Sequence, residues 1–247
     1  MLPARVHAAW PGLDGIERLP GGQRNEVWSA TWEGTRVALR RSRRSPASLR
    51  WELDLLVTLA RAGVHVPEPI PTSTGELHHG AFVVQAWIEG RPPTSDADWQ
   101  RVADELARVH ALPTPFGQRP ACCVVTELGT VGRSVDVDLA ALPADVRTLV
   151  VDVFDTFTDA PVSLVHGDPG PGNVRIDEEG AVWLLDWDES RIDVTWHDLS
   201  DLRIPVLDGD TRRRAEMLSN AWEAVNAWVL EPDYARTRLA ALQARLP

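Results

Sequence analysis

The chain has 247 residues, enough to bury a sizeable core as one large domain or as two smaller ones. Its formal net charge of −11 argues against a nucleic-acid or anionic-membrane surface and mildly favours cationic small-molecule partners. No apolar run is long enough for a membrane span or a secretory signal, so a cytoplasmic protein is expected. The adjacent residues Cys122 and Cys123 are expected to be reduced packing residues.

Strands and a single helix are expected in the first 90 residues. Ser45 and Pro46 are typical of a helix start, and leucines follow at helical spacing as far as Gly63. A proline-rich loop is expected at residues 66–69. Three segments with alternating or continuous apolar residues favour strands: 25–32, 35–41 and 81–88.

After Gly90 the pattern becomes mainly helical. A helix is expected to begin at Ser95–Asp96, another to span residues 143–158, and three more to follow residue 195. Three short strands are expected between them, at 162–165, 174–176 and 181–185. The sequence therefore predicts two domains, residues 1–90 and residues 91–247, joined at a hinge near residues 85–90.

Three oxygen-bearing side chains follow two of these strands. Residues 164–173 (LVHGDPGPGN) carry Asp168 and Asn173 in a tight loop, and residues 183–188 (WLLDWD) deliver Asp186 after a short hairpin. The three side chains are expected at one edge of a small sheet. A carboxylate that orients a hydroxyl beside a hard cation requires such a set.

The pattern His-Gly-Asp-x-x-x-x-Asn … Asp resembles the aminoglycoside phosphotransferase-like, or choline kinase-like, branch of the protein-kinase-like fold. The resemblance covers nearly the whole chain. It implies an α+β bilobal fold, with an antiparallel-sheet N-terminal lobe that contains one helix and a mainly helical C-terminal lobe. It also implies a kinase that uses ATP or GTP with Mg²⁺ to phosphorylate a hydroxyl group of a small molecule, as a monomer or a homodimer.

The resemblance assigns roles in the C-terminal domain. Asp168 would position the acceptor hydroxyl and take its proton, and Asn173 and Asp186 would hold Mg²⁺. His166 would brace the loop by hydrogen bonds. Asp198, in a segment similar to the family's Asp-Leu-Ala, would anchor the catalytic loop by accepting from its backbone N–H groups.

The nucleotide side is implied by shorter patterns. Gly21 and Gly22 lie in a loop that could fold over phosphates, although a plain turn fits a Gly-Gly pair equally well. Val-Ala-Leu-Arg at residues 37–40 aligns with the kinase-type Val-Ala-Ile-Lys, with Arg40 in the place of lysine and Glu52 as its partner. All 25 basic residues are arginines, so this exchange agrees with the composition of the whole chain.

The resemblance also bears on the hinge, on the residues before Asp198 and on Asp188. Gln85, Ala86 and Ile88 would lie at the adenine, with the backbone groups of Ala86 and Ile88 meeting its edge. The family often has Gly-Asp-Pro shortly before the Asp198 position, whereas this chain has Asp-Val-Thr at residues 193–195. Asp188 is expected to be exposed or to lie behind the metal ligands.

Two other functions compete with the kinase. A pseudokinase that binds a nucleotide or a partner is favoured by the missing lysine and the loose glycine loop, but opposed by the intact Asp168, Asn173 and Asp186 set. Residues 186–190 also resemble the loop of haloacid-dehalogenase-like phosphatases, whose sheet would be parallel and doubly wound rather than antiparallel. The substrate stays open among an aminoglycoside, another antibiotic, choline, a sugar and homoserine, as does a role in antibiotic resistance or in metabolism.

Overall fold

The chain forms two compact units in the computed structural model, which describes residues 4–20, 25–113, 117–200, 202–203 and 207–246. The first unit comprises Met1–Pro92 and Arg175–Leu185, and the second comprises Pro93–Val174 and Asp186–Pro247. Residues 175–185 belong to the first unit, which differs from the single division expected at residue 90.

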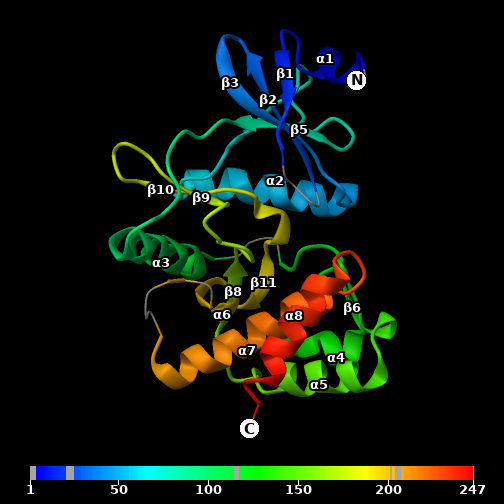
Figure 1. The fold of residues 1–247 in the computed structure, drawn as a ribbon. Coiled ribbons are helices and arrows are strands. Elements are labelled where there is room, and N and C mark those ends of the chain that lie inside the picture. Colours follow the sequence, from blue (N-terminus) through cyan, green and yellow to red (C-terminus); the bar gives the residue numbers. More distant parts are fainter. Residues whose placement is uncertain (1–3, 21–24, 114–116, 201, 204–206, 247) are drawn as a thin grey trace. The chain divides into compact units, whose positions relative to one another are not determined.

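A five-stranded sheet forms the body of the first unit (Figure 1). Its strands lie in the order β1-β2-β3-β5-β4, and each neighbouring pair is antiparallel. The strands are β1 (Asp14–Arg18), β2 (Glu26–Trp32), β3 (Thr35–Arg41), β4 (Pro69–Ile70) and β5 (Phe82–Ala86). The predicted antiparallel sheet is therefore confirmed, and the parallel sheet that the phosphatase alternative requires is not the one that forms.

The register of β3 determines which residues face helix α2 (Pro46–Arg61). Successive side chains of a strand point to opposite faces of its sheet. Val37 and Leu39 are buried in an apolar cluster with Trp10 and Phe82. Arg40 therefore points to the opposite face, where α2 supplies its ion-pair partner.

Helix α2 begins and ends as predicted. The Ser45 side chain accepts a hydrogen bond from the Ser48 amide at 3.3 Å, and Pro46 occupies the first turn. Gly63, with a φ of 80°, follows the C-cap in the left-handed conformation that favours glycine. Both ends of the helix were therefore readable from the sequence.

A hairpin of β9 (Val174–Ile176) and β10 (Val182–Leu184) joins the first unit through the backbone. The Arg91 amide donates to the Ile176 carbonyl at 3.0 Å, and the Ile176 amide donates to the Arg91 carbonyl at 2.8 Å. The Leu184 amide donates to the His65 carbonyl at 3.0 Å. These bonds explain why the hairpin groups with the sheet unit rather than with the motif loops that flank it in sequence.

Strand β5 is shorter than the segment 81–88 that was predicted. Its last pair with β3 joins Ala86 to Val37, and its last pair with β4 joins Gln85 to Pro69. Residues beyond Ala86 have no strand partner in this ladder, because the rest of β3 pairs with β2 alone. Strand β4 was expected to be loop, and its two residues are too few to give an alternating pattern.

Helix α1 (Ala4–Ala9) and strand β1 were not predicted. Ile16 is the one large apolar residue of β1, and the four remaining residues of the strand are all exposed. A segment of this composition has no periodic apolar signal. It is recognised as a strand only through its pairing with β2.

The second unit is mainly helical, as expected (Figure 1). Its helices are α3 (Asp96–Ala111), α4 (Leu128–Val131), α5 (Ala144–Asp155), α6 (Trp196–Leu199), α7 (Gly209–Asn226) and α8 (Pro232–Gln243). Short 3-10 helices are η1 (Val125–Glu127), η2 (Leu139–Ala141) and η3 (Trp187–Glu189), and two small strand pairs are β6 (Arg133–Ser134) with β7 (Val137–Asp138) and β8 (Val162–Val165) with β11 (Arg191–Val194). Apolar residues of α5, α7 and α8, among them Phe154, Leu218 and Leu242, form the core.

The β8–β11 pair brings the two motif loops to the same place. The strands are antiparallel, and Val165 at the end of β8 lies opposite Arg191 at the start of β11. The loop that begins at His166 and the segment that ends at Ser190 therefore meet at one end of this ladder. Strand β11 was not predicted, because two of its buried positions hold Arg191 and Asp193, and Val194 is the one apolar residue buried with them.

Across the described part of the chain, no helix combines the length and the apolar character that crossing a bilayer requires.

Candidate active site

The loop after β8 presents Asp168 to solvent and ties Asn173 to it. Asn173 Nδ2 donates to Asp168 Oδ2 at 2.8 Å and to the Asp168 carbonyl at 3.0 Å. A carboxylate can only accept, so the amide group must turn its nitrogen toward Asp168. The Asn173 Oδ1 atom is then the acceptor that this side chain keeps for another contact.

The buried carboxylate of Asp198 holds the start of this loop. Asp198 Oδ2 accepts from the His166 amide and Oδ1 accepts from the Gly167 amide, both at 2.8 Å. His110 Nε2, on α3, donates to Asp198 Oδ2 at 2.9 Å. These contacts are of the kind that the resemblance implies for Asp198, with His110 as a partner that the sequence did not indicate.

The ionisation of Asp198 is set by the same neighbours. Burial alone would raise the pKa of this carboxyl, but the hydrogen bond and charge of His110 and the hydrogen bond from the Gly167 amide outweigh it. The pKa of Asp198 therefore lies below its usual value. The anionic form is the one that can accept from both backbone N–H groups.

His166 supports the loop from inside. Its side chain is fully buried, and its Nδ1 accepts from the Asp168 amide at 3.2 Å. Its ring packs against the ring of Trp187, with centroids 4.7 Å apart. His166 thus connects the Asp168 loop to the segment that follows Asp186.

Asp186 is exposed, and its backbone is strained. Its φ of 54° and ψ of 72° lie in the left-handed region, which a residue with a side chain adopts at a cost. Trp187 and Asp188 after it are buried, so of the two expectations for Asp188, exposed or behind the metal ligands, the exposed position is not the one observed. A Cβ atom on Gly167 would lie 2.6 Å from the Glu189 carbonyl, so this position requires glycine. The Asp168 loop and the 186–190 segment are therefore in van der Waals contact.

The side chains at this end of the ladder fit a sparse cation site. Among the described residues, no group of three or more His, Cys, Asp or Glu side chains could hold a metal ion. Mg²⁺ is commonly bound through one or two protein oxygens together with substrate phosphates. The Asn173 amide oxygen and the exposed Asp186 carboxylate are donors of that kind.

In the first unit, Arg40 and Glu52 form a buried ion pair between β3 and α2. Arg40 is 5% exposed and Glu52 is 1% exposed. Removing one member of such a pair leaves an uncompensated buried charge. The predicted partnership of these two residues is thus present as a contact.

The remaining predicted nucleotide residues have mixed surroundings. Gly21 and Gly22 lie outside the described residues. The Gln85 side chain is buried and donates to the Pro67 carbonyl at 3.3 Å. The Ala86 amide donates to the Glu68 carbonyl at 3.0 Å, so this amide is already engaged within the first unit. Ile88 is half-buried and lies beyond the end of β5.

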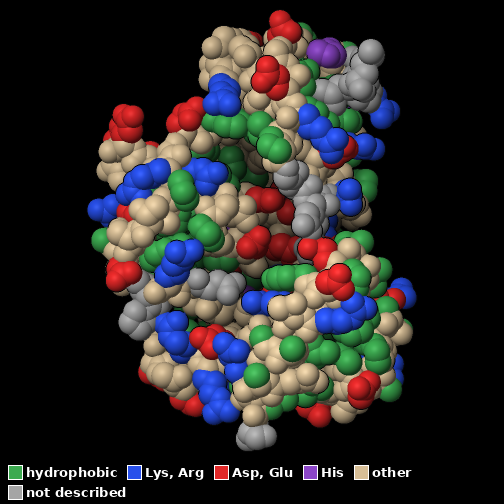
Figure 2. Space-filling view, viewed as in Figure 1, with side chains coloured by type: hydrophobic (Ala, Val, Ile, Leu, Met, Phe, Trp, Pro, Cys, Tyr) green, Lys and Arg blue, Asp and Glu red, His purple; other side chains and the backbone are tan. Residues whose placement is uncertain are grey.

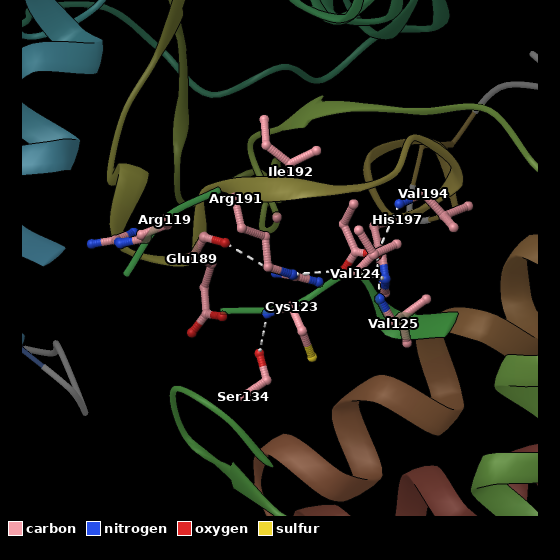
Figure 3. A network of polar contacts seen from close by, with 12 residues as sticks. Arg119, Cys123, Val124, Val125, Ser134, Glu189, Arg191, Ile192, Val194 and His197 are labelled. Atoms are coloured by element: carbon pink, nitrogen blue, oxygen red, sulfur yellow. Dashed lines mark hydrogen bonds and ion pairs between the residues drawn. The ribbon is translucent and has the colours of Figure 1, made fainter. Parts of the chain in front are cut away.

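A buried charged network behind the 186–190 segment was missed by the sequence analysis (Figure 3). Asp193 accepts from Arg191 Nε at 2.7 Å and from the Val125 amide at 2.8 Å, and His197 Nε2 lies 3.3 Å away. Burial would raise the pKa of Asp193, but the charges of Arg191 and His197 lower it far below its usual value. The Arg191 guanidinium also stacks on Trp222, 3.9 Å from the ring centroid. Asp193 was noted only as a departure from the family pattern, and a charged residue in a strand gives no signal of such burial.

The chain is similar to known proteins over nearly its whole length. The model of a family described as a phosphotransferase enzyme family matches residues 15–242. Among similar solved structures, choline kinase from Streptococcus pneumoniae has 14% identity and a TM-score of 0.71, over 98% of this chain and 96% of that one. The complex of APH(2″)-IIa with streptomycin and ATP has 12% identity and a TM-score of 0.69, over 99% and 97%. Amicoumacin kinase with AMP-PNP and Ca²⁺ has 19% identity and a TM-score of 0.62, over 98% and 84%. These likenesses show a shared fold.

The substitution Asp198→Asn should destabilise the protein in a pH-dependent way. An amide cannot replace the charge and both acceptor oxygens, so the free energy of unfolding at pH 7 should fall by about 1–3 kcal/mol. The contribution of a carboxyl with a lowered pKa is present above its unfolded-state pKa and is lost as the pH falls through its folded-state pKa. Urea unfolding at several pH values should therefore show the variant and the wild type converging in acid. A constant difference at all pH values would contradict the assignment, and Asp152→Asn, at an exposed position of α5, is the control.

Proposed function

Because the chain belongs to the phosphotransferase enzyme family, we propose that it transfers the terminal phosphoryl group of ATP to a hydroxyl group of a small molecule, with Mg²⁺. The observation that carries the proposal is the meeting of Asp168, Asn173 and the Asp186 segment at one end of the β8–β11 ladder. Phosphoryl transfer depends mainly on positioning and on charge neutralisation, which such a set can provide.

In this proposal Asp168 acts on the acceptor. Its exposed carboxylate accepts a hydrogen bond from the acceptor hydroxyl and takes the proton as the new O–P bond forms. The bond between the terminal phosphorus and its bridging oxygen breaks, and ADP leaves. The Asn173 amide nitrogen, 2.8 Å from Asp168 Oδ2, keeps the carboxylate in one orientation.

Asn173 Oδ1 and the Asp186 carboxylate are the proposed cation ligands. Bound Mg²⁺ would neutralise charge on the phosphate oxygens. Arg40, held by Glu52, is the proposed phosphate contact in the first unit. The complexes of related folds with ATP, and with AMP-PNP and Ca²⁺, support a nucleotide and a divalent cation as cofactors.

The acceptor is proposed to be cationic because of how charge is distributed along the chain. The sequence of the first unit holds twelve arginines and twelve carboxylates, whereas that of the second holds thirteen arginines and 24 carboxylates. The whole formal charge of −11 therefore belongs to the unit that carries Asp168. On the visible face, arginines are scattered among carboxylates (Figure 2). A negative unit raises the local concentration of a cationic amine or amino sugar.

Calorimetric titration with ATP, with and without Mg²⁺, tests the proposal. Binding should strengthen when Mg²⁺ is present, and Asp186→Asn should lose that dependence because one cation ligand becomes a neutral amide. A parallel titration with GTP distinguishes the two nucleotides. The absence of binding under every condition would contradict the proposed kinase activity and favour the pseudokinase. Arg40 in the place of lysine would then explain the loss of nucleotide binding.

The substitution Asp168→Asn should abolish turnover but leave ATP binding close to that of the wild type. Loss of a positioned proton acceptor typically costs about 10²–10⁴-fold in rate. The measurement is ADP release with a panel of hydroxyl-bearing amines, next to calorimetry with ATP. Near-normal turnover would refute the role of Asp168, and Asp155→Asn, at an exposed position of α5, serves as the matched control.

Lysine should replace Arg40 better than alanine does. Arg40→Ala leaves Glu52 charged, buried and unpaired, which should cost about 3–5 kcal/mol of unfolding free energy and raise the KM for ATP. Arg40→Lys keeps the positive charge. Urea unfolding and the KM for ATP provide the two measurements, with Arg41→Ala, at an exposed neighbour in β3, as the control. Equal KM values for the lysine and alanine variants would mean that Arg40 does not touch phosphate.

A further inference from the structure

Two adjacent side chains, Gln118 and Arg119, bind the backbone around the 186–190 segment. They lie between α3 and η1, in a stretch that carries none of the motif residues. Gln118 Nε2 donates to the Ile192 carbonyl at 2.7 Å, and Gln118 Oε1 accepts from the Ile192 amide at 3.0 Å. Gln118 thus binds both backbone groups of a residue in β11, as a neighbouring strand would do.

Arg119 binds three backbone carbonyls of the segment itself. Arg119 is 2% exposed, and its Nη1 lies 3.2 Å from the carbonyl oxygen of Trp187, 2.8 Å from that of Asp188 and 3.1 Å from that of Ser190. Buried carbonyls require donors, and hydrogen bonds from a charged donor are the stronger kind. All of these acceptors are main-chain atoms, so Arg119 fixes the path of the backbone.

The position of Asp186 gives this contact a consequence for the site. A residue in the left-handed region keeps that conformation only when its surroundings determine it. On one side, Gly167 packs against the Glu189 carbonyl, and Arg191 Nη1 donates to the same oxygen at 3.0 Å (Figure 3). Arg119 binds the carbonyls of Trp187 and Asp188, which precede Glu189, and that of Ser190, which follows it. The turn that follows Asp186 is therefore fixed at each of its carbonyl groups.

We propose that Arg119 is a positioning residue for Asp186: its guanidinium holds the turn that keeps the Asp186 backbone left-handed and its carboxylate directed for the cation. The inference rests on the proposed function, because Asp186 is a cation ligand only there. Arg119 does not touch substrate or cation in this scheme. It acts through the three carbonyls.

The test measures the Mg²⁺ concentration that gives half-maximal ATP binding, by calorimetry. Arg119→Met keeps the length of the side chain without its donors, and it should raise that concentration by about tenfold or more, as the loss of groups behind a metal ligand typically does. At saturating Mg²⁺, its ATP affinity should approach that of the wild type. Arg119→Lys retains the charge on a shorter side chain and should give an intermediate value.

Arg238→Met is the matched control, because Arg238 donates to Ser219 Oγ at 2.9 Å between α8 and α7, away from the motif segments. It should leave the Mg²⁺ dependence unchanged. Wild-type Mg²⁺ dependence in Arg119→Met would overturn the inference, and so would an equal loss of ATP affinity at every Mg²⁺ concentration. If Arg119→Met does not fold, Arg119→Lys decides by the same criteria.

The wild type and Asp186→Asn separate this inference from the proposed function. Failure of the wild type to bind ATP in a Mg²⁺-dependent way overturns both. Mg²⁺-dependent binding that Asp186→Asn loses and Arg119→Met keeps overturns only the role of Arg119.

Discussion

The carboxylate of Asp198 is the contact on which the Asp168 loop depends. It is fully buried, and it binds two successive backbone amides at the end of β8. The cost of burying the charge is offset by these donors and by His110, whose own carbonyl accepts from Ser163 Oγ at 2.6 Å. Helix α3, strand β8 and the loop are thereby linked through one anion. A neutral side chain could fill the space but could not hold the two amides.

Three buried guanidinium groups hold other parts of the two units: the 186–190 segment, strand β11 and the contact between β3 and α2. Arg119 binds carbonyl oxygens, Arg191 binds the Asp193 carboxylate and the Trp222 ring, and Arg40 binds Glu52. In each case a planar group with several donors meets acceptors that are fixed in place. These three arginines place their charge in the interior, where each meets its acceptors.

The elements that carry periodic or punctuating residues could be predicted from the sequence. The strands β2 and β3, both ends of α2, the start of α3 and the loop positions of Asp168, Asn173 and Asp186 all have local signals. Strand β11 and the Arg191–Asp193–His197 network could not be predicted, because charged residues in a strand normally indicate exposure. Arg119 also gave no signal, since the three carbonyls that it binds lie 68 to 71 positions away, and the sequence contains no pattern for such contacts. Burial of charge through long-range pairing is thus the physical reason for most of what was missed.

The arginine at position 40 affects how its ion pair with Glu52 responds to a rise in pH. A lysine ammonium loses its proton readily when it is taken out of water, so a buried lysine–glutamate pair can become neutral at a moderately alkaline pH. A guanidinium remains protonated under the same conditions. The positive charge opposite Glu52 is therefore permanent, and the contact between strand and helix keeps its cation where a lysine in the same place could lose it.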